Sequence, residues 1–179
     1  MLIVIGGLPG TGKTTLARLL AARIGGVHLR VDTIEHAIVR SGLADHPLGH
    51  AGYVVGYALA EEHLRQGLTV IAESVNPLPI TRDSWLDAAR NAGVPAVEIE
   101  VICSDPAEHR HRVISRSVDI PGLPLPDWQQ VLDRDYRPWN RDHVIVDTAG
   151  ESPGRSLHRL LRKLEHHGLH SDSILDADT

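Results

Sequence analysis

The chain has 179 residues, of which 42% are hydrophobic and 23% charged, and its formal net charge at pH 7 is −5. This size and composition predict one globular domain, and the acidic balance disfavours a large basic nucleic-acid surface. A single cysteine, Cys103, excludes an internal disulfide framework and a multi-cysteine zinc site. No apolar run approaches the ~20 residues of a membrane span, and Met1 leads straight into an apolar run with no charged leader, so we expect a cytoplasmic protein.

Short apolar runs alternate with helical patterns along the chain. We expect strands at 2–5, 27–31, 68–72, 96–103 and 143–146. Helices are expected at 14–24, 32–41, 51–66, 81–91, 105–116, 127–136 and 153–166, followed by a polar, flexible tail at 168–179. The alternation predicts an α/β fold with a parallel sheet and helices on both faces. Ligands of such sheets bind at the carboxyl ends of the strands.

A glycine-rich loop follows the first expected strand. Residues 7–14 read Gly-Leu-Pro-Gly-Thr-Gly-Lys-Thr and match the pattern G-x-x-x-x-G-K-[ST] between a strand and a helix. Such a loop turns backbone N–H groups toward a phosphate at a helix N-terminus. Lys13, one of two lysines among eighteen cationic residues, is expected to reach the β- and γ-phosphates of ATP, and the Thr14 hydroxyl to ligate Mg²⁺. The expected nucleotide-binding residues here are Gly7, Pro9, Gly10, Thr11, Gly12, Lys13, Thr14 and Thr15.

Asp32 follows the second expected strand and is the candidate general base. A kinase needs a group that orients and deprotonates the attacking hydroxyl, and aspartate does this in other phosphoryl-transfer enzymes. The sequence Asp32-Thr33-Ile34-Glu35 is also a capping box, in which Asp32 would cap a helix. The two interpretations are compatible.

Polar residues also follow the third expected strand. Glu73 is expected to hold Mg²⁺ or to accept a substrate proton, and Asn76 either orients a substrate group or initiates the turn before Pro77. Arg82 is a further candidate substrate contact, although an arginine near Trp85 at helical spacing more often covers a core edge.

The helix expected at 105–116 carries several arginines. Ser104 or Asp105 would cap it, with Glu108 completing a capping box. Arg112 and Arg116 lie four residues apart, and such like charges disfavour a helix unless an anion faces them. Both are therefore candidate catalytic arginines, Arg112 also contacting the nucleotide. The proline-rich segment 119–126 that follows is either the arm of a moving lid or a rigid connector.

Twelve histidines raise the possibility of a metal site. The densest group, His166, His167 and His170, lies in a polar segment without carboxylate or cysteine partners at ligand spacing, so we favour a solvated tail.

Taken together, these motifs over residues 1–165 resemble those of the small P-loop kinases, grouped with AAA-family ATPases and similar to chloramphenicol phosphotransferase, gluconate kinase, zeta toxins and polynucleotide 5′-kinase domains. The resemblance implies a P-loop three-layer sandwich with strand order 2-3-1-4-5, which places Glu73 beside the phosphate loop. It implies that residues 1–167 form the kinase domain with a small helical lid at about 105–137. It also implies that Asp32 is the base and that Arg112 and Arg116 are lid arginines. Arg30-Val31-Asp32 replaces the Ser-x-Asp of polynucleotide kinases, and Glu73-Ser74-Val75-Asn76 replaces their Asp-x-Thr-Asn turn, which disfavours a polynucleotide substrate.

The leading hypothesis is an ATP- and Mg²⁺-dependent kinase acting on a hydroxyl of a small molecule, as a monomer or homodimer with no membrane partner. One alternative is a polynucleotide 5′-hydroxyl kinase, and another is a nucleotide-binding switch without its own acceptor. The sequence identifies neither the acceptor nor the preference between ATP and GTP.

Overall fold

Five parallel strands form one sheet in the order β2-β3-β1-β4-β5, as the resemblance implies. β1 lies at the centre, paired with β3 from Leu2↔Val70 to Ile5↔Glu73 and with β4 on its other side. The strands are β1 (Leu2–Gly6), β2 (Val27–Arg30), β3 (Val70–Glu73), β4 (Ala96–Ile102) and β5 (Val144–Asp147).

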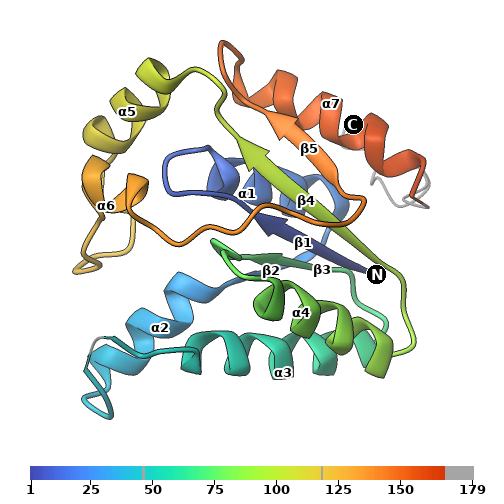
Figure 1. Cartoon of the computed structure of the whole chain (residues 1–179). Helices are drawn as coiled ribbons and strands as arrows, with labels where there is room; N and C mark the ends of the chain where they lie inside the picture. The colour runs from blue at the N-terminus through green and yellow to red at the C-terminus, as the bar shows by residue number, and fades with distance from the viewer. Residues whose placement is uncertain (46, 118, 168–179) are drawn as a thin grey trace, which may run out of the picture.

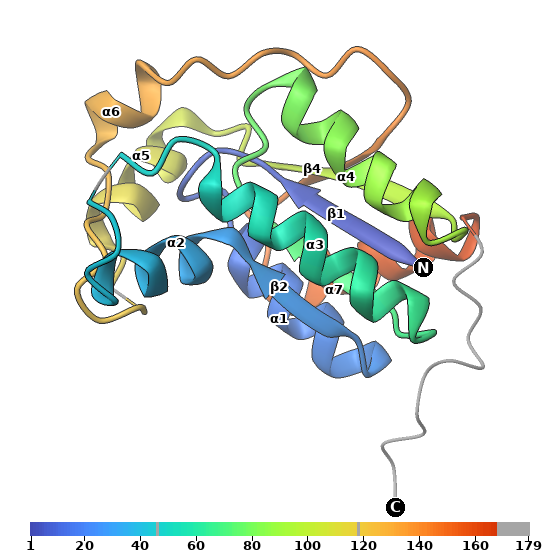
Figure 2. The same cartoon turned by 90° about the horizontal axis from the view of Figure 1, so that it is seen from below.

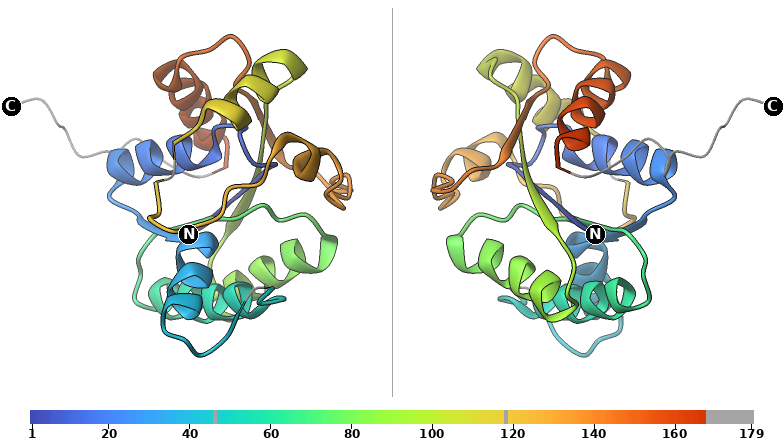
Figure 3. Two further views of the ribbon diagram at one scale, coloured as in Figure 1. Left: turned by 90° about the vertical axis from the view of Figure 1, so that its left-hand side faces the viewer. Right: turned by 90° about the vertical axis from the view of Figure 1, so that its right-hand side faces the viewer.

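Helices cover both faces of the sheet, which gives the expected three-layer α/β/α sandwich (Figures 1 and 3). The α1–α7 layer and the α3–α4 layer lie on opposite sides of the strands. The helices are α1 (Lys13–Ile24), α2 (Val31–Arg40), α3 (Ala51–Arg65), α4 (Pro79–Asn91), α5 (Pro106–Ser115), α6 (Trp128–Leu132) and α7 (Pro153–Glu165).

Two apolar cores result from the alternation of side chains along the central strand. Ile3 and Ile5 point to one face, where leucines of α1 and α7 cover them. Leu2 and Val4 point to the other face, where α3 and α4 contribute a core that includes Trp85. Because β1 is buried on both faces, its sequence is continuously apolar rather than alternating, as parallel sheets require.

Three helices gather at the carboxyl edge of the sheet. α2, α5 and α6 lie together on the side toward which the strand arrows point (Figure 1), and Figure 2 shows the same grouping from below. After α6 the chain runs back across the sheet to β5 without regular structure, where Trp139 packs against Gly6. This edge is where the sequence places the candidate functional residues.

The computed structural model describes residues 1–45, 47–117 and 119–167. The expected tail at 168–179, with His170, lies outside them. The helix expected at 127–136 is shorter than predicted, Trp128–Leu132, with Asp127 as the cap of a complete capping box. Across the described residues, no helix is both long and apolar enough to cross a membrane.

Candidate active site

The glycine-rich loop between β1 and α1 has the backbone that the motif requires. Gly7 and Gly10 have φ of 145° and 86°, in the region that favours glycine. A Cβ atom at Gly7 would collide with the carbonyl oxygen of Val101, and one at Gly10 would lie 2.5 Å from Cγ2 of Val113. Larger residues at these positions would therefore displace the loop from the end of the sheet.

Side chains from two distant elements hold this loop in place. His109 of α5 donates from Nε2 to the carbonyl of Pro9 at 2.8 Å, and Thr148, just after β5, donates from Oγ1 to the carbonyl of Thr11 at 2.8 Å. Both loop carbonyls are thus engaged from outside, which leaves the inner side of the loop to its N–H groups. The sequence gives no signal for His109 beyond a polar residue on a buried helix face, so its role was missed.

Lys13 begins α1 and is 7% exposed. Its ammonium donates one long hydrogen bond, 3.4 Å, to the carbonyl of Leu8. Burial lowers the pKa of Lys13, although the negative charges of Glu73 and Asp32 oppose this shift. A desolvated ammonium with so weak a partner is suited to an anionic ligand, because pairing would offset the cost of its burial.

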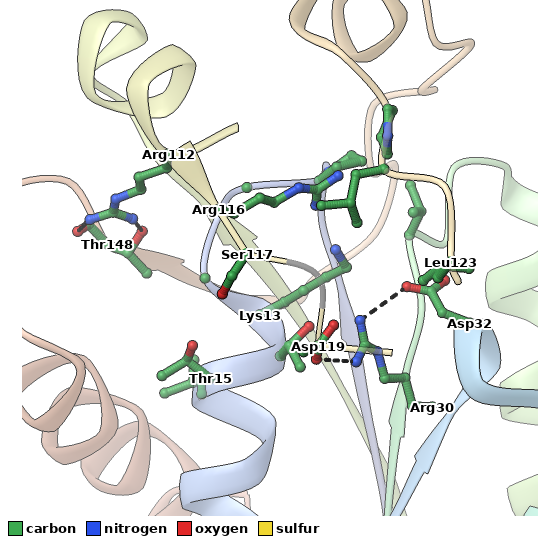
Figure 4. A pocket seen from close by; sticks show the side chains of 18 of the residues that line it. Lys13, Thr15, Arg30, Asp32, Arg112, Arg116, Ser117, Asp119, Leu123 and Thr148 are labelled. Atoms are coloured by element: carbon green, nitrogen blue, oxygen red, sulfur yellow. Dashed lines mark hydrogen bonds and ion pairs between the residues drawn. The ribbon is translucent and has the colours of Figure 1, made fainter. Parts of the chain in front are cut away.

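A cavity of about 1180 Å³ opens at the carboxyl edge of the sheet and unites most of the predicted residues (Figure 4). The glycine-rich loop and α1 form its floor, α2 and α5 form walls, and the proline-rich segment after α5 crosses it. The predicted site residues that line it are Pro9, Gly10, Gly12, Lys13, Thr14, Thr15, Asp32, Arg112 and Arg116.

The two predicted arginines have different environments. Arg112 donates to Oγ1 and the carbonyl of Thr148, at 2.7 and 2.8 Å, and to Glu108 at 2.5 Å, so it is fixed in position. Glu108 also accepts from the amide of Gly150, and the predicted capping box with Asp105 is wrong, although Asp105 does cap α5.

Arg116 lies just beyond the end of α5, so the predicted like-charge pair on one helix face is wrong. Within the described residues, its Nε and Nη2 atoms are buried without a hydrogen-bond partner. Burial lowers the pKa of Arg116, opposed by the carboxylates of Asp32 and Asp119. A half-buried guanidinium with two unsatisfied donor atoms beside Lys13 on the cavity wall fits a site built for a phosphate.

Asp32 faces the cavity from the first turn of α2 (Figure 4). The helix begins at Val31 with Arg30 at the N-cap position and without a side-chain cap, so the predicted capping role of Asp32 is wrong. Its carboxylate accepts a long hydrogen bond, 3.4 Å, from Nη2 of Arg30. It is therefore accessible to a ligand in the cavity.

Glu73 ends β3, next to the strand that leads into the glycine-rich loop, and its side chain is buried under the loop rather than facing the cavity. It is 1% exposed, and its carboxylate accepts hydrogen bonds from the hydroxyl of Thr14 and from Nε2 of His28, the latter at 2.9 Å. Burial alone would raise the pKa of Glu73, but the His28 hydrogen bond, the Lys13 charge and the Thr14 hydrogen bond lower it overall. Glu73 thus orients the Thr14 hydroxyl and remains ionised.

Asn76 and Arg82, which the sequence offered as possible substrate contacts, are buried away from the cavity. Arg82 is 1% exposed and donates to four backbone carbonyls, those of Asn76, Pro77, Arg137 and Pro138, at 2.5 to 3.2 Å. Asn76 has a φ of 50°, and its Oδ1 accepts from Nε1 of Trp85 at 3.1 Å. Both side chains support the turn after β3 and the segment returning from α6, as the core-edge interpretation of Arg82 expected.

Glu35 lines the cavity, although the sequence pattern indicated it only as part of a capping box. It lies one turn after Asp32 on α2, and its side chain packs where Gly52 of α3 leaves room. Burial and the nearby Asp32 raise the pKa of Glu35 to about 7, and Arg134 opposes the shift. Glu35, Asp32, Gln130 and Arg134 give one end of the cavity a polar wall distinct from the phosphate loop.

No group of three or more histidine, cysteine, aspartate or glutamate side chains suited to a metal ion occurs among the residues that the structure describes. A magnesium ion bound with a nucleotide needs fewer protein ligands, because it takes phosphate and water oxygens as well. The Thr14 hydroxyl, oriented by ionised Glu73, fits this requirement.

A family model described as an AAA domain (AAA_33) matches residues 2–134. No curated protein matches the chain. A protein from Chloroflexus aurantiacus superposes with a TM-score of 0.70 at 21% identity, covering 92% of this chain and 96% of that chain.

Two further solved structures have this fold. A sugar kinase from Janibacter sp. HTCC2649 has a TM-score of 0.62 at 19% identity and covers 92% of this chain and 94% of its own. The Mycobacterium tuberculosis APS kinase CysC, in complex with AMPPNP and APS, has a TM-score of 0.64 at 15% identity and covers 92% of this chain and 96% of its own. At these identities the similarity establishes the fold.

Proposed function

Because this chain belongs to the AAA_33 family of small P-loop kinase domains, we propose that it is an ATP-dependent kinase that phosphorylates a hydroxyl group of a small molecule. The observation that carries the proposal is the shared cavity. It brings the phosphate loop, Lys13, Arg116 and the carboxylate of Asp32 to one space.

In the proposed reaction, loop N–H groups and Lys13 bind the β- and γ-phosphates, and Arg112 flanks the nucleotide. The acceptor oxygen bonds to the γ-phosphorus while the bond from that phosphorus to the β–γ bridging oxygen breaks, and ADP leaves. Asp32 takes the proton of the acceptor hydroxyl. Arg116 stabilises the charge that develops on the transferred group, which gives its unsatisfied donors a role.

Mg²⁺ would supply neutralisation of the phosphate charge. The Thr14 hydroxyl would hold it, and Glu73 would act through Thr14 and bound water, because its own carboxylate is buried and already hydrogen-bonded.

The wall that carries Asp32 and Glu35 favours a small acceptor over an oligonucleotide. The carboxylate of Asp32 would repel the first phosphates of an oligonucleotide that presents its 5′-hydroxyl, and Glu35, one turn further along the helix, adds to this repulsion as the pH rises through about 7. The alternative of a nucleotide-binding switch is disfavoured, because a protein that phosphorylates no acceptor does not require a general base such as Asp32 in the cavity. Similarity to a sugar kinase supports a hydroxylated acceptor as well.

A screen of hydroxylated metabolites that records ADP release tests the proposal. The Lys13→Ala variant serves as the blank, and Lys163→Ala is the matched control because Lys163 is the other lysine and lies on α7, where it donates to Ile145. We expect acceptor-dependent ADP release by the wild type and by the Lys163 variant. Release that does not depend on any acceptor, or that persists in Lys13→Ala, would contradict the proposal.

A further inference from the structure

Arg30 ends β2 and lies among three carboxylates from separate parts of the fold, of which Figure 4 shows Asp32 and Asp119. Its side chain is 11% exposed. Nη1 donates to Asp119 at 2.5 Å, Nη2 donates to Asp32 at 3.4 Å, and Nε lies 3.8 Å from Glu73. One guanidinium thus contacts the segment that crosses the cavity, the candidate base and the carboxylate that orients Thr14.

Asp119 fastens the proline-rich segment to the sheet edge. We call residues 119–127 the α5–α6 loop. Asp119 accepts from Arg30 and also from Arg18 of α1 at 2.7 Å. Burial alone would raise the pKa of Asp119, but the hydrogen bonds and charges of Arg30 and Arg18 lower it overall. Leu123 and Pro124 of the same loop line the cavity, so the loop is fastened in a position that covers the site.

The two hydrogen bonds of Arg30 differ in strength. A separation of 2.5 Å is that of a strong charge-assisted hydrogen bond, whereas 3.4 Å lies at the weak limit. Within the described residues, Nε is buried and makes no hydrogen bond. Arg30 therefore has unused donor capacity, and Asp119 determines where the guanidinium is held.

We propose that Arg30 is a positioning residue that links closure of the α5–α6 loop to the availability of Asp32. With Asp119 in place, Arg30 is drawn to the loop, and Asp32 is left with one long hydrogen bond and is free to accept the acceptor proton. When Asp119 leaves, Arg30 turns its two Nη donors to Asp32, one to each carboxylate oxygen, and this pairing makes Asp32 a weaker base. The base then becomes available only under a closed loop, which would limit transfer of phosphate to water.

This inference rests on the proposed function for its catalytic consequence, but its structural part can be tested without an acceptor. The probe is the carboxyl ¹³C resonance of Asp32 in protein labelled at aspartate side chains. We expect Asp119→Asn to shift this resonance, because Asp32 gains a guanidinium partner, and the double variant Asp119→Asn/Arg30→Gln to return it toward the wild-type position. Arg18→Gln is the matched control, since Arg18 also contacts Asp119 but is 54% exposed and does not contact Asp32.

The proposal is overturned if the Asp32 resonance does not move in Asp119→Asn. It is also overturned if Arg18→Gln shifts this resonance as far as Asp119→Asn does. Hydrogen exchange of the core strands shows whether each variant remains folded, and exchange of residues 119–126 shows whether the loop has opened.

Once the screen has identified an acceptor, kinetics test the catalytic part. Asp119→Asn should lower kcat by about 10- to 100-fold, the range of one charge-assisted hydrogen bond, with the KM for ATP changed by less than about 2-fold. The double variant should recover part of the lost kcat. If the loop only covered the site, the double variant would recover none of the lost kcat. Equal losses of kcat in the single and double variants would therefore overturn the proposed link between Arg30 and Asp32. If no acceptor is phosphorylated, the kinase proposal fails while the resonance experiment still decides the role of Arg30.

Discussion

The cavity has two ends that are built in different ways. At the phosphate end, backbone groups form the surface, and fixed hydrogen bonds from His109 and Thr148 hold them. At the other end, side chains such as Asp32, Glu35 and Arg134 form the wall from separate elements. A backbone cradle is specified by a short local motif, whereas a wall of side chains can change with single substitutions. On the proposed function, we expect the phosphate end to set the class of chemistry and the opposite end to select the acceptor.

Removing Lys13 has the largest expected effect, and it tests whether the phosphate end of the cavity binds ATP. Lys13→Ala should weaken ATP binding by roughly 10²- to 10³-fold, because the phosphates lose a buried cationic partner. Titration calorimetry with a non-hydrolysable ATP analogue measures the effect, and Lys163→Ala should bind as the wild type does. Unchanged affinity in Lys13→Ala would mean that the loop does not bind phosphate.

Asp32→Asn distinguishes the two ends of the cavity, because it should lower the rate of phosphoryl transfer without changing the affinity for ATP. We expect phosphoryl transfer to fall by roughly 10²-fold, since an amide cannot accept the proton, while ATP affinity changes by less than about 2-fold. Single-turnover transfer with the acceptor found in the screen measures the rate. Asp142→Asn, an exposed position, is the control. Transfer at the wild-type rate would remove Asp32 from the mechanism.

Thr148→Val tests whether the phosphate end depends on support from outside the loop. The valine removes the hydrogen bond to the Thr11 carbonyl and also the one that Oγ1 accepts from Arg112, at about 1 kcal/mol each, so we expect ATP binding to weaken by about 5- to 30-fold. The same calorimetric titration reports it, with Thr69→Val, which lies just before the amino end of β3, as the control. A loop that is rigid by itself would bind ATP equally well in both variants.

The smallest effect concerns Glu35 and pH. Its pKa of about 7 is above the usual value of 4.5, so the folded state disfavours its charge. Its contribution to stability is present below about pH 4.5 and is lost as the pH rises through 7. Glu35→Gln should therefore gain stability over the wild type between pH 5 and pH 8, by about 1 kcal/mol after allowance for solvent screening.

Thermal unfolding at several pH values measures this difference, and Glu165→Gln at an exposed position is the control. A difference between wild type and Glu35→Gln that does not vary with pH would show that Glu35 keeps an ordinary pKa.

The sequence predicted the strands and the phosphate loop well, because both follow from local patterns: apolar runs of strand length, and eight residues with defined backbone needs. The strand order came from the resemblance to the small P-loop kinases, and the structure has that order. For Asn76 and Arg82 the sequence left two interpretations open, and the structure shows why. Arg82 is satisfied by carbonyls at 137–138, more than fifty residues away, and no local pattern shows that a polar side chain will find such partners. Asp32 was located correctly at the sheet edge, but its capping role was not, since α2 begins one residue earlier.

Arg30 and Glu35 were overlooked for the same reason. Each gains its significance from a neighbour in another element, Asp119 for Arg30 and Gly52 for the packing of Glu35. Their residue types alone predict only a charged surface. Side-chain constellations of this kind become visible when the tertiary structure is known.

The attachment of the segment after α6 has a practical consequence for engineering. Arg82 binds its carbonyls and Trp139 packs against Gly6, so residues 137–139 are joined to the same framework as the central strand. A fluorophore at Asp133 or Asp135, where the side chains are exposed, should leave that framework intact, whereas Arg134 between them lines the cavity. An insertion at 137–139 would remove the carbonyls that accept from Arg82 and would displace the Trp139 ring from Gly6 at the end of β1.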